Sequence, residues 1–439
     1  MTPAIISLIV FGICVVLFIW NKLPIATTAL LGLVAMILLD VCTFSEGFKN
    51  FAGSTVVLIC AMMVVGQAAF DTGLAQLVGN KVIGLAKGNE RLIVILGTLI
   101  TGLISAFLSN IATLAIMISI MTSVCASNNA VRFKNVIMPI SMAAVIGGAA
   151  TLVGSTTQLT GQGILETYLG EGNGFDFFTF MIPGFIILAV LIFYVGFIGY
   201  PLGKKIWGGR EDYSKPPVLD DAAKKAGETE FKKSKIIIMA VIFVATLVLF
   251  VFADPIKENL IPNFSITMVS LIAALACVLT GCITHKNAIK SINWSLALWF
   301  CSSLGIAEAL NVSGGGELLA NWFIGLFGKD MSAFTLYTAF VLFVVLLTQF
   351  LSNSTVLTIA LPIAIPLTME LGYNPFPFAV GMTIGAAMAV ATPLANTTIG
   401  MSMVADYKFS DYLKYAGPAT AVSLILTLVI VPLIWPLVG

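Results

Sequence analysis

The chain has 439 residues, of which 59% are apolar and only 10% are charged, and its formal net charge is +1. Its mean hydropathy is +1.04. A water-soluble globule is excluded, because soluble domains carry about 25% charged residues. We therefore expect an integral membrane protein that is surrounded by membrane lipid and has no nucleic-acid partner.

The apolar residues form continuous runs that suit membrane-spanning helices, which need about 20 residues each. The alternating pattern of a transmembrane β-barrel does not recur in the sequence. The predicted spans, in chain order, are 4–20, 24–40, 54–70, 136–165, 177–200, 236–252, 264–283, 293–310, 376–405 and 414–437. Two further stretches, 91–126 and 335–369, are too long for one span and contain polar interruptions, so each is predicted to form two half-length helices.

Two pairs of polar interruptions repeat along the chain. The segments 109–113 (SNIAT) and 352–355 (SNST) begin 243 residues apart, and the segments 154–157 (GSTT) and 391–394 (ATPL) begin 237 residues apart. A helix that stops inside a bilayer leaves N–H and C=O groups unsatisfied unless protein, water or a ligand meets them. Half-helix N-termini suit an anion, whereas unwound carbonyls with Ser, Thr and Asn oxygens suit a hard cation such as sodium. The pattern therefore predicts an anion site and a cation site at each of the two pairs of interruptions.

The basic residues predict the orientation in the membrane. If 91–126 and 335–369 are re-entrant hairpins, all of the 22 Lys and Arg residues except Lys49, Lys257 and Lys329 lie on one face. Treating either hairpin as a full crossing would scatter the basic residues over both faces. The basic face is therefore predicted to be cytoplasmic, and both termini are predicted to lie outside the cell (inner or plasma) membrane.

The chain divides into two halves that align at an offset near 243 residues. The predicted parts are a first repeat at 1–202 with hairpin 91–126 and broken helix 136–165, a cytoplasmic linker at 203–235, and a second repeat at 236–439 with hairpin 335–369 and broken helix 376–405. Because each half holds about five spans, an odd number, the second half enters from the opposite side of the membrane. The predicted fold class is an all-α polytopic membrane protein of two inverted repeats, each with about five spans, one re-entrant hairpin and a broken helix.

The charged residues restrict the chemistry of the site. The interiors of the predicted spans and hairpin arms hold no Lys, Arg or His, so helix dipoles, hydroxyls, amides and bound cations would hold an anionic substrate. Glu308 is the one acid well within a span, and its place near the outer end of 293–310 favours an interfacial acid over a proton site. Oxygen ligands without titratable groups favour sodium over protons. The only histidine, His285, lies in a predicted loop, and we expect no enzyme.

These paired motifs resemble those of the divalent anion sodium symporter family, whose members move dicarboxylates, tricarboxylates or sulfate across membranes. The resemblance extends over the whole chain, since 23–31 (LPIATTALL), 409–414 (FSDYLK) and 434–436 (IWP) are similar to the ends of that family. It implies a homodimer that works as a sodium-coupled symporter of divalent organic anions, such as C4-dicarboxylates, by alternating access.

The resemblance also implies two sodium sites at the hairpin tips and a substrate site beside them. The implied sodium ligands are Ser105, Ser109, Asn110 and the Gly154 carbonyl in the first half, and Thr348, Ser352, Asn353 and the Ala391 carbonyl in the second. The implied substrate contacts are Asn110, Ser155, Asn353, Ser354, Thr392 and Pro393. Ser105 and Ser109, like Thr348 and Ser352, are one helical turn apart, which can place both hydroxyls near one ion.

The first half departs from the family pattern. Ile111 stands where the family has a threonine, and Thr156 and Thr157 stand where it has two prolines. The second half keeps only Pro393 of its proline pair. We therefore expect the substrate to differ from a simple C4-dicarboxylate, or to be held mainly by the second half.

Other functions stay open at this point. A sodium-independent anion exchanger, a proton-coupled antiporter, or a transporter of another anion such as sulfate or citrate would suit the same features. A channel is disfavoured, because the polar residues cluster at two tips instead of lining a pore. The amphipathic segments 74–88 and 316–328 are predicted either to link a moving domain to a scaffold or to lie in the headgroup layer.

Overall fold

We describe a computed structural model of the chain, which covers residues 2–20, 22–128, 130–170, 172–210, 231–262, 264–327 and 331–438. Every regular element within these ranges is helical, as predicted. Most of the predicted linker, 203–235, lies outside the described residues.

The first half begins with five α-helices and a short 3₁₀ turn and continues into the hairpin. Its elements are α1 (Pro3–Trp20), α2 (Ile25–Leu38), α3 (Phe44–Phe48), η1 (Lys49–Ala52), α4 (Ser54–Asp71), α5 (Leu74–Gly84), α6 (Glu90–Ser105), α7 (Asn110–Ser127), α8 (Phe133–Gly148), α9 (Thr156–Leu169), α10 (Met181–Tyr194), the π-helical η2 (Val195–Gly199) and α11 (Tyr200–Trp207).

The second half repeats this order. Its elements are α13 (Lys233–Val251), α14 (Ala253–Asn259), α15 (Ile266–Leu279), α16 (His285–Ser291), α17 (Trp294–Val312), α18 (Gly315–Phe327), α19 (Ala333–Leu347), α20 (Asn353–Glu370), α21 (Pro375–Ala386), α22 (Thr397–Met401), η3 (Ser402–Ala405) and α23 (Phe409–Ile434).

Seven of the described helical stretches are long and apolar enough to cross a membrane. Other predicted spans are shorter helices. For example, α2 has 14 residues, because Pro24 precedes it and Asp40, with φ +54°, turns the chain after it. The helical backbone is interrupted at two places within the stretches 136–165 and 376–405. One interruption separates α8 from α9, and the other separates α21 from α22.

The stretches 91–126 and 335–369 each form two helices that return to the end from which they start. At the base of the first hairpin, Asn128 Nδ2 donates to the Gly88 carbonyl over 3.2 Å. At the base of the second, Tyr373 Oη donates to the Met331 carbonyl over 2.6 Å. Each tip is the short turn between the arms, α6 to α7 and α19 to α20.

The helices pack as two groups. The hairpins and broken helices pack on one another through α6–α8, α7–α8, α19–α21 and α20–α21 contacts, and we call this group the hairpin body. The other group, which we call the frame, is held by α2–α17, α4–α15 and α13–α15 contacts. Helix α9 of the hairpin body packs against α17 and α4 of the frame. Gly163 allows this approach, because a Cβ there would lie 2.9 Å from Phe300 and Leu304 side-chain atoms.

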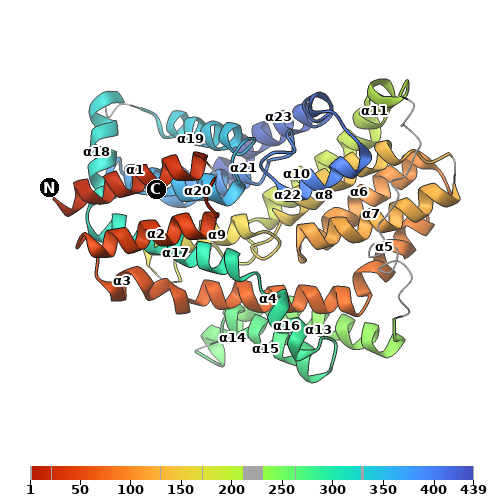
Figure 1. The fold of residues 1–439 in the computed structure, drawn as a ribbon, viewed down its shortest axis with the longest axis horizontal. Coiled ribbons are helices and arrows are strands. Elements are labelled where there is room, and N and C mark those ends of the chain that lie inside the picture. Colours follow the sequence, from red (N-terminus) through yellow and green to blue (C-terminus); the bar gives the residue numbers. More distant parts are fainter. Residues whose placement is uncertain are drawn as a thin grey trace.

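Helices α5 and α18 lie at opposite ends of the molecule, with α6 and α7 near α5 and with α19 and α20 toward α18 (Figure 1). Both termini lie toward the α18 end. Ser7 Oγ, near the N-terminus, is 2.9 Å from Ser313 Oγ just before α18, and Asn374 N, at the base of the second hairpin, donates to Leu437 O over 2.9 Å.

Candidate functional site

The first centre lies where the tip of the first hairpin meets the break after α8. Ser105, at the end of α6, is fully buried. Its Oγ lies 2.6 Å from the Ala144 carbonyl oxygen and 2.8 Å from Asn110 Oδ1. The Ser105 hydroxyl thus joins the tip to α8 and also contacts the Asn110 amide. Neither side chain is ionisable.

The amide of Asn110 lies in a cluster of oxygens. With its nitrogen turned toward them, Asn110 donates to Ser105 Oγ over 2.8 Å, to Gly154 O over 3.1 Å and to Ala144 O over 3.2 Å. With its oxygen turned toward them, Oδ1 accepts from Ser105 Oγ. The oxygens of Ser105 in the tip, Ala144 in α8 and Gly154 in the break therefore face one small volume. The Asn110 amide faces the same volume and can present either its N–H donor or its oxygen acceptor.

Two glycines make this convergence possible. A Cβ on Gly148 would lie 2.1 Å from Asn110 Oδ1, and a Cβ on Gly154 would lie 2.6 Å from the carbonyl oxygens of both Ala106 and Gly148. The break is also tied to the tip, because Thr151 Oγ1 donates to the Ala106 carbonyl and accepts from Gly154 N over 3.2 Å. Larger side chains at either glycine would push these oxygens apart.

The second centre repeats the same hydrogen bonds. Thr348 Oγ1 donates to the Ala386 carbonyl over 2.8 Å and lies 3.2 Å from Asn353 Oδ1. Thr392 Oγ1 donates to the Gln349 carbonyl, as Thr151 donates to Ala106 in the first half. The tips of the two halves therefore correspond at an offset of 243 residues, as the motifs predict.

Gln349 is a residue of this centre that the sequence analysis did not single out. Its Nε2 donates to Met388 O over 3.0 Å, and its Oε1 accepts from Ala391 N over 3.1 Å. The first half has Ala106 at the corresponding position. The single glutamine inside the apolar stretch 335–369 was the available signal.

The breaks correspond differently from the predicted pairing of Ser155 with Thr392. Thr392 makes the bond that Thr151 makes, 241 residues earlier. Ser155 caps α9 by accepting from Thr157 N, and Asn396 caps α22 by accepting from Thr398 N. The matching segments are 150–157 (ATLVGSTT) and 391–398 (ATPLANTT). Asn396 therefore stands opposite Ser155, and it was missed because the GS and AT pairs look alike in sequence.

The two centres belong to one assembly. Helix α9, which leaves the first break, packs on α20 and α21, while α22, which leaves the second break, packs on α7 and α8. Ile146 and Ala149 of the first half line a space of about 10 Å³ together with Ala387 and Met388 of the second. Such a space is at the lower limit for a single water. The ends of α8 and α21, where the two breaks begin, therefore border the same small space.

The remaining predicted site residues lie around these centres. Ser352 caps α20 by accepting from Thr355 N, whereas Ser109 is exposed and makes no cap bond to α7. Ser354 is buried, and its carbonyl accepts from Thr358 Oγ1 over 3.0 Å. Pro393 is half-buried beside the second break. Ile111, the departure at the first tip, is 48% exposed.

The profile of the citrate transporter family, CitMHS, matches residues 15–356 and 261–438. The chain belongs to this family. An uncharacterized transporter of Haemophilus influenzae is 26% identical to the chain over 395 residues, 87% of this chain and 81% of that protein. Sodium-dependent dicarboxylate transporter SdcS of Staphylococcus saprophyticus is 23% identical over 457 aligned positions, 96% of this chain and 84% of SdcS.

A further relative, an uncharacterized transporter of Synechocystis, is 32% identical over 193 residues, but this match spans only 44% of the chain and 31% of that protein. The fold is similar to that of the YdaH transporter of Alcanivorax borkumensis, with a TM-score of 0.65, 15% identity, and coverage of 97% of this chain and 100% of that one. The Neisseria gonorrhoeae MtrF structure gives a TM-score of 0.61 and 14% identity, covering 100% of this chain and 96% of that one.

These relationships confirm the resemblance drawn from the motifs. The citrate transporter family member described here is a multi-pass membrane protein and a secondary transporter, and it is not an enzyme.

Proposed function

We propose that this transporter is a sodium-coupled symporter of divalent organic anions, with C4-dicarboxylates among its substrates. The observation that supports this most strongly is the cluster of oxygens around the Asn110 amide, where Ser105 Oγ, Ala144 O and Gly154 O all lie within 3.2 Å of one nitrogen position. A group that interacts favourably with all three oxygens must carry positive charge, as a cation or an N–H donor does.

These three oxygens are suitable ligands for sodium. Hard cations prefer carbonyl, hydroxyl and amide oxygens. An ion between Ser105, Ala144 and Gly154 would let the Asn110 amide turn its oxygen inward and leave its nitrogen for a substrate carboxylate. Ion binding and substrate binding would then depend on the same side chain, which is what coupling requires. The second centre would act in the same way through Thr348 and Asn353.

The anion would lie where helix N-termini approach from both halves. Helices α7 and α20 begin at Asn110 and Asn353, and α9 begins beside Ser155. Such N-termini carry a partial positive charge and unpaired N–H groups. Together with bound cations, they would offset the charge of a dicarboxylate without a basic side chain. The proposed substrate contacts are Asn110, Ser155, Asn353, Ser354, Thr392 and Pro393, and the geometry adds Asn396.

Transport would occur by movement of the hairpin body against the frame. The opposite placement of α5 and α18, and the repeated bonds of Ser105 and Thr348, support two inverted repeats. Lys204 and Glu90, 3.8 Å apart, lie at the base of the first hairpin, as does Lys134, and this basic end would face the cytoplasm. Both termini, at the α18 end, would then lie outside. We also propose that two copies of the chain form a homodimer in which the frame of one contacts the frame of the other.

Uptake into proteoliposomes tests the proposal. Labelled succinate, citrate and sulfate are offered with and without an inward sodium gradient, and with or without the same solute inside. We expect uptake of at least one dicarboxylate to require sodium. Uptake that is independent of sodium but requires preloaded solute would overturn symport in favour of exchange, and transport of sulfate alone would overturn the substrate class.

The family description favours citrate as a second candidate substrate. The exposed apolar Ile111 at the first tip removes a hydroxyl from the proposed substrate contacts, which favours a different anion. Competition between citrate and succinate for the same sodium-dependent uptake decides between them.

A further inference from the structure

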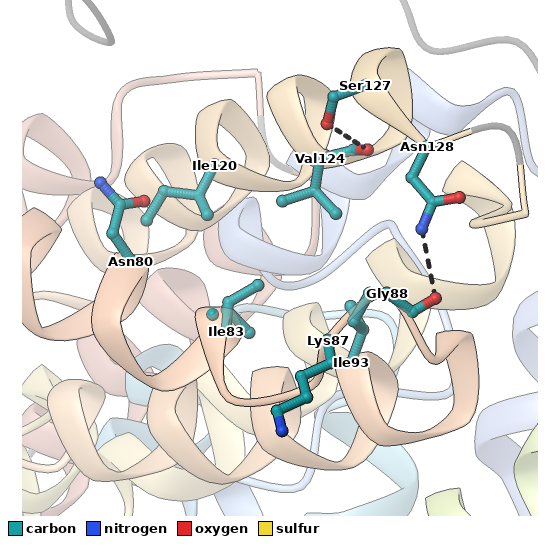
Figure 2. A pocket seen from close by; sticks show the side chains of 10 residues that line it. Asn80, Ile83, Lys87, Gly88, Ile93, Ile120, Val124, Ser127 and Asn128 are labelled. Carbon is teal, nitrogen blue, oxygen red and sulfur yellow. Dashed lines mark hydrogen bonds between the residues drawn. The ribbon is translucent and has the colours of Figure 1, made fainter.

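A cavity of about 270 Å³ lies between helix α5 and the base of the first hairpin (Figure 2). Its apolar wall is formed by Ile83 of α5, Ile93 of α6, and Ile120 and Val124 of α7. Since one water occupies about 30 Å³ in the liquid, the cavity is far larger than a single ion or water requires. It is separate from the two centres at the hairpin tips.

Fixed contacts hold the cavity open. At one end, α5 approaches α7 closely at Gly79, where a Cβ would lie 2.9 Å from Ile120 Cδ1. At the other end, Asn128 Nδ2 donates to Gly88 O over 3.2 Å (Figure 2). Between these contacts the helices stand apart, since a Cβ on Gly84 would meet no heavy atom within 4 Å.

The rim of the cavity is polar and basic. It carries the amide of Asn80 and the exposed side chain of Lys87, and the residues that line the cavity include no carboxylate. The carboxylate of nearby Glu90 is turned away, because its Oε1 accepts from Arg132 N over 2.7 Å and from Asn135 Nδ2 over 3.1 Å. An apolar wall with a cationic rim suits an amphiphile with a negatively charged head.

We propose that this cavity binds an anionic phospholipid of the surrounding membrane. One acyl chain packs on Ile83, Ile120 and Val124, and the phosphate head group faces Lys87 and Asn80. Helix α5 is amphipathic and lies at the basic end of the molecule, where membrane surfaces offer anionic head groups. In the orientation of the proposed function, this is the cytoplasmic leaflet.

The bound lipid would affect transport because of where it lies. It occupies the space between α5 and α7, and α7 begins at Asn110, in the first centre. A bound lipid adds contacts between α5 and α7 where the two helices stand apart, and so ties α5 more firmly to the hairpin. This consequence rests on the proposed function, but the binding of lipid does not.

Lipid binding to the purified full-length chain in detergent tests the proposal, with phosphatidylglycerol and phosphatidylcholine titrated separately and adducts counted by native mass spectrometry. Gly84→Leu fills the cavity, and we expect it to weaken phosphatidylglycerol binding at least tenfold. Lys87→Gln removes one cationic contact and should weaken it about fivefold. The matched control is Gly325→Leu on α18, where a Cβ also meets nothing within 4 Å, and it should bind like the parent chain.

Unchanged binding of phosphatidylglycerol to Gly84→Leu, or equal binding of both lipids to the parent chain, would overturn the proposal. If Gly84→Leu does not fold, Val124→Phe fills the cavity from the opposite wall and takes its place. Displacement of the lipid by inorganic phosphate would show a site for a soluble anion and would also overturn it.

A transport measurement separates this proposal from the proposed function. We expect sodium-dependent uptake by the parent chain to differ between liposomes with and without phosphatidylglycerol, and uptake by Gly84→Leu to be the same in both. Absence of uptake in every lipid would count against the proposed function alone, since the binding titration decides the occupant of the cavity independently.

Discussion

At the first centre the tip carries Ala106 and α8 ends in Gly147 and Gly148, whereas at the second the tip carries Gln349 and the break carries Met388 and Ala389. The hydrogen bonds that join tip to break are otherwise the same. The first centre is therefore shaped by the absence of side chains, and the second is braced by an amide that bonds the break directly. The two copies of a duplicated site can therefore keep similar hydrogen bonds while one uses glycines to make space and the other uses an added amide side chain.

The largest effect should come from removing the amide that faces the first oxygen cluster. We expect Asn110→Ala to raise the sodium concentration needed for half-maximal uptake by about 10- to 100-fold, because hydrogen bonds and contacts to charged groups contribute about 1.5–3 kcal/mol. Asn353→Ala should cost less, since Gln349 still holds the second break. Sodium titrations of succinate or citrate uptake measure both changes.

The matched control for these variants is Asn173→Ala, whose amide donates to Leu169 O on the surface. Sodium dependence should be unchanged in this variant. An Asn110→Ala chain with parental sodium dependence would refute the cation site at the first centre.

The next effect concerns the glycine that leaves room for Asn110. Gly148→Ala adds one methyl group 2.1 Å from Asn110 Oδ1, so the amide must move although no ligand is lost. Overpacking of this kind costs about 1–3 kcal/mol. We expect weaker stabilisation by sodium in a thermal unfolding assay. The reciprocal Ala389→Gly in the second half should leave that stabilisation nearly unchanged, and equal losses in both variants would contradict the contrast between the halves.

The brace in the second half predicts a loss of stability. Gln349→Ala leaves Ala391 N without its side-chain partner, while Met388 O keeps the bond from Val390 N over 2.8 Å. An unsatisfied buried group costs about 1–3 kcal/mol. The midpoint of thermal unfolding should fall even without sodium. Gln67→Ala, which removes a bond to Asp71 at a less buried place, serves as control. A drop of the same size in the control would show that position 349 has no special role.

The smallest effect should follow from restoring the family residue at the first tip. Ile111 is 48% exposed, so Ile111→Thr should change the unfolding midpoint little. Its hydroxyl adds a polar contact at the proposed anion site, and we expect a several-fold shift in the ratio of succinate to citrate uptake. An unchanged ratio would place the substrate away from this tip.

The sequence was sufficient to predict an all-helical membrane protein and its transporter family, whereas the re-entrant hairpins and the site residues at their tips stay predictions. Helical spans follow from runs of apolar residues, and the hairpins follow from the distribution of basic residues over the two faces. These signals are local or additive along the chain. They do not depend on which residue of one half faces which residue of the other.

The pairing between the breaks and the tips was harder to predict. The bonds from Thr151 to Ala106 and from Thr392 to Gln349 join residues 45 and 43 positions apart, and they set which residues of the two breaks correspond. Short motifs of small residues match at more than one register, so Asn396 was overlooked. The role of Gln349 depends on the backbone of the second break, which a motif search does not describe.

The hydroxyls of Thr151 and Thr392 have one more consequence. Each fastens a break to the hairpin tip of its own half, so the two pieces that surround a proposed ion travel together. Because the tip and the break stay joined, a proposed ion between them would not be released by their separation. It would be released when the whole site becomes exposed to water at one side of the membrane. A carrier coupled as we propose would lose few ions in mid-passage, and Thr151 would protect its ratio of ions to substrate without contacting either.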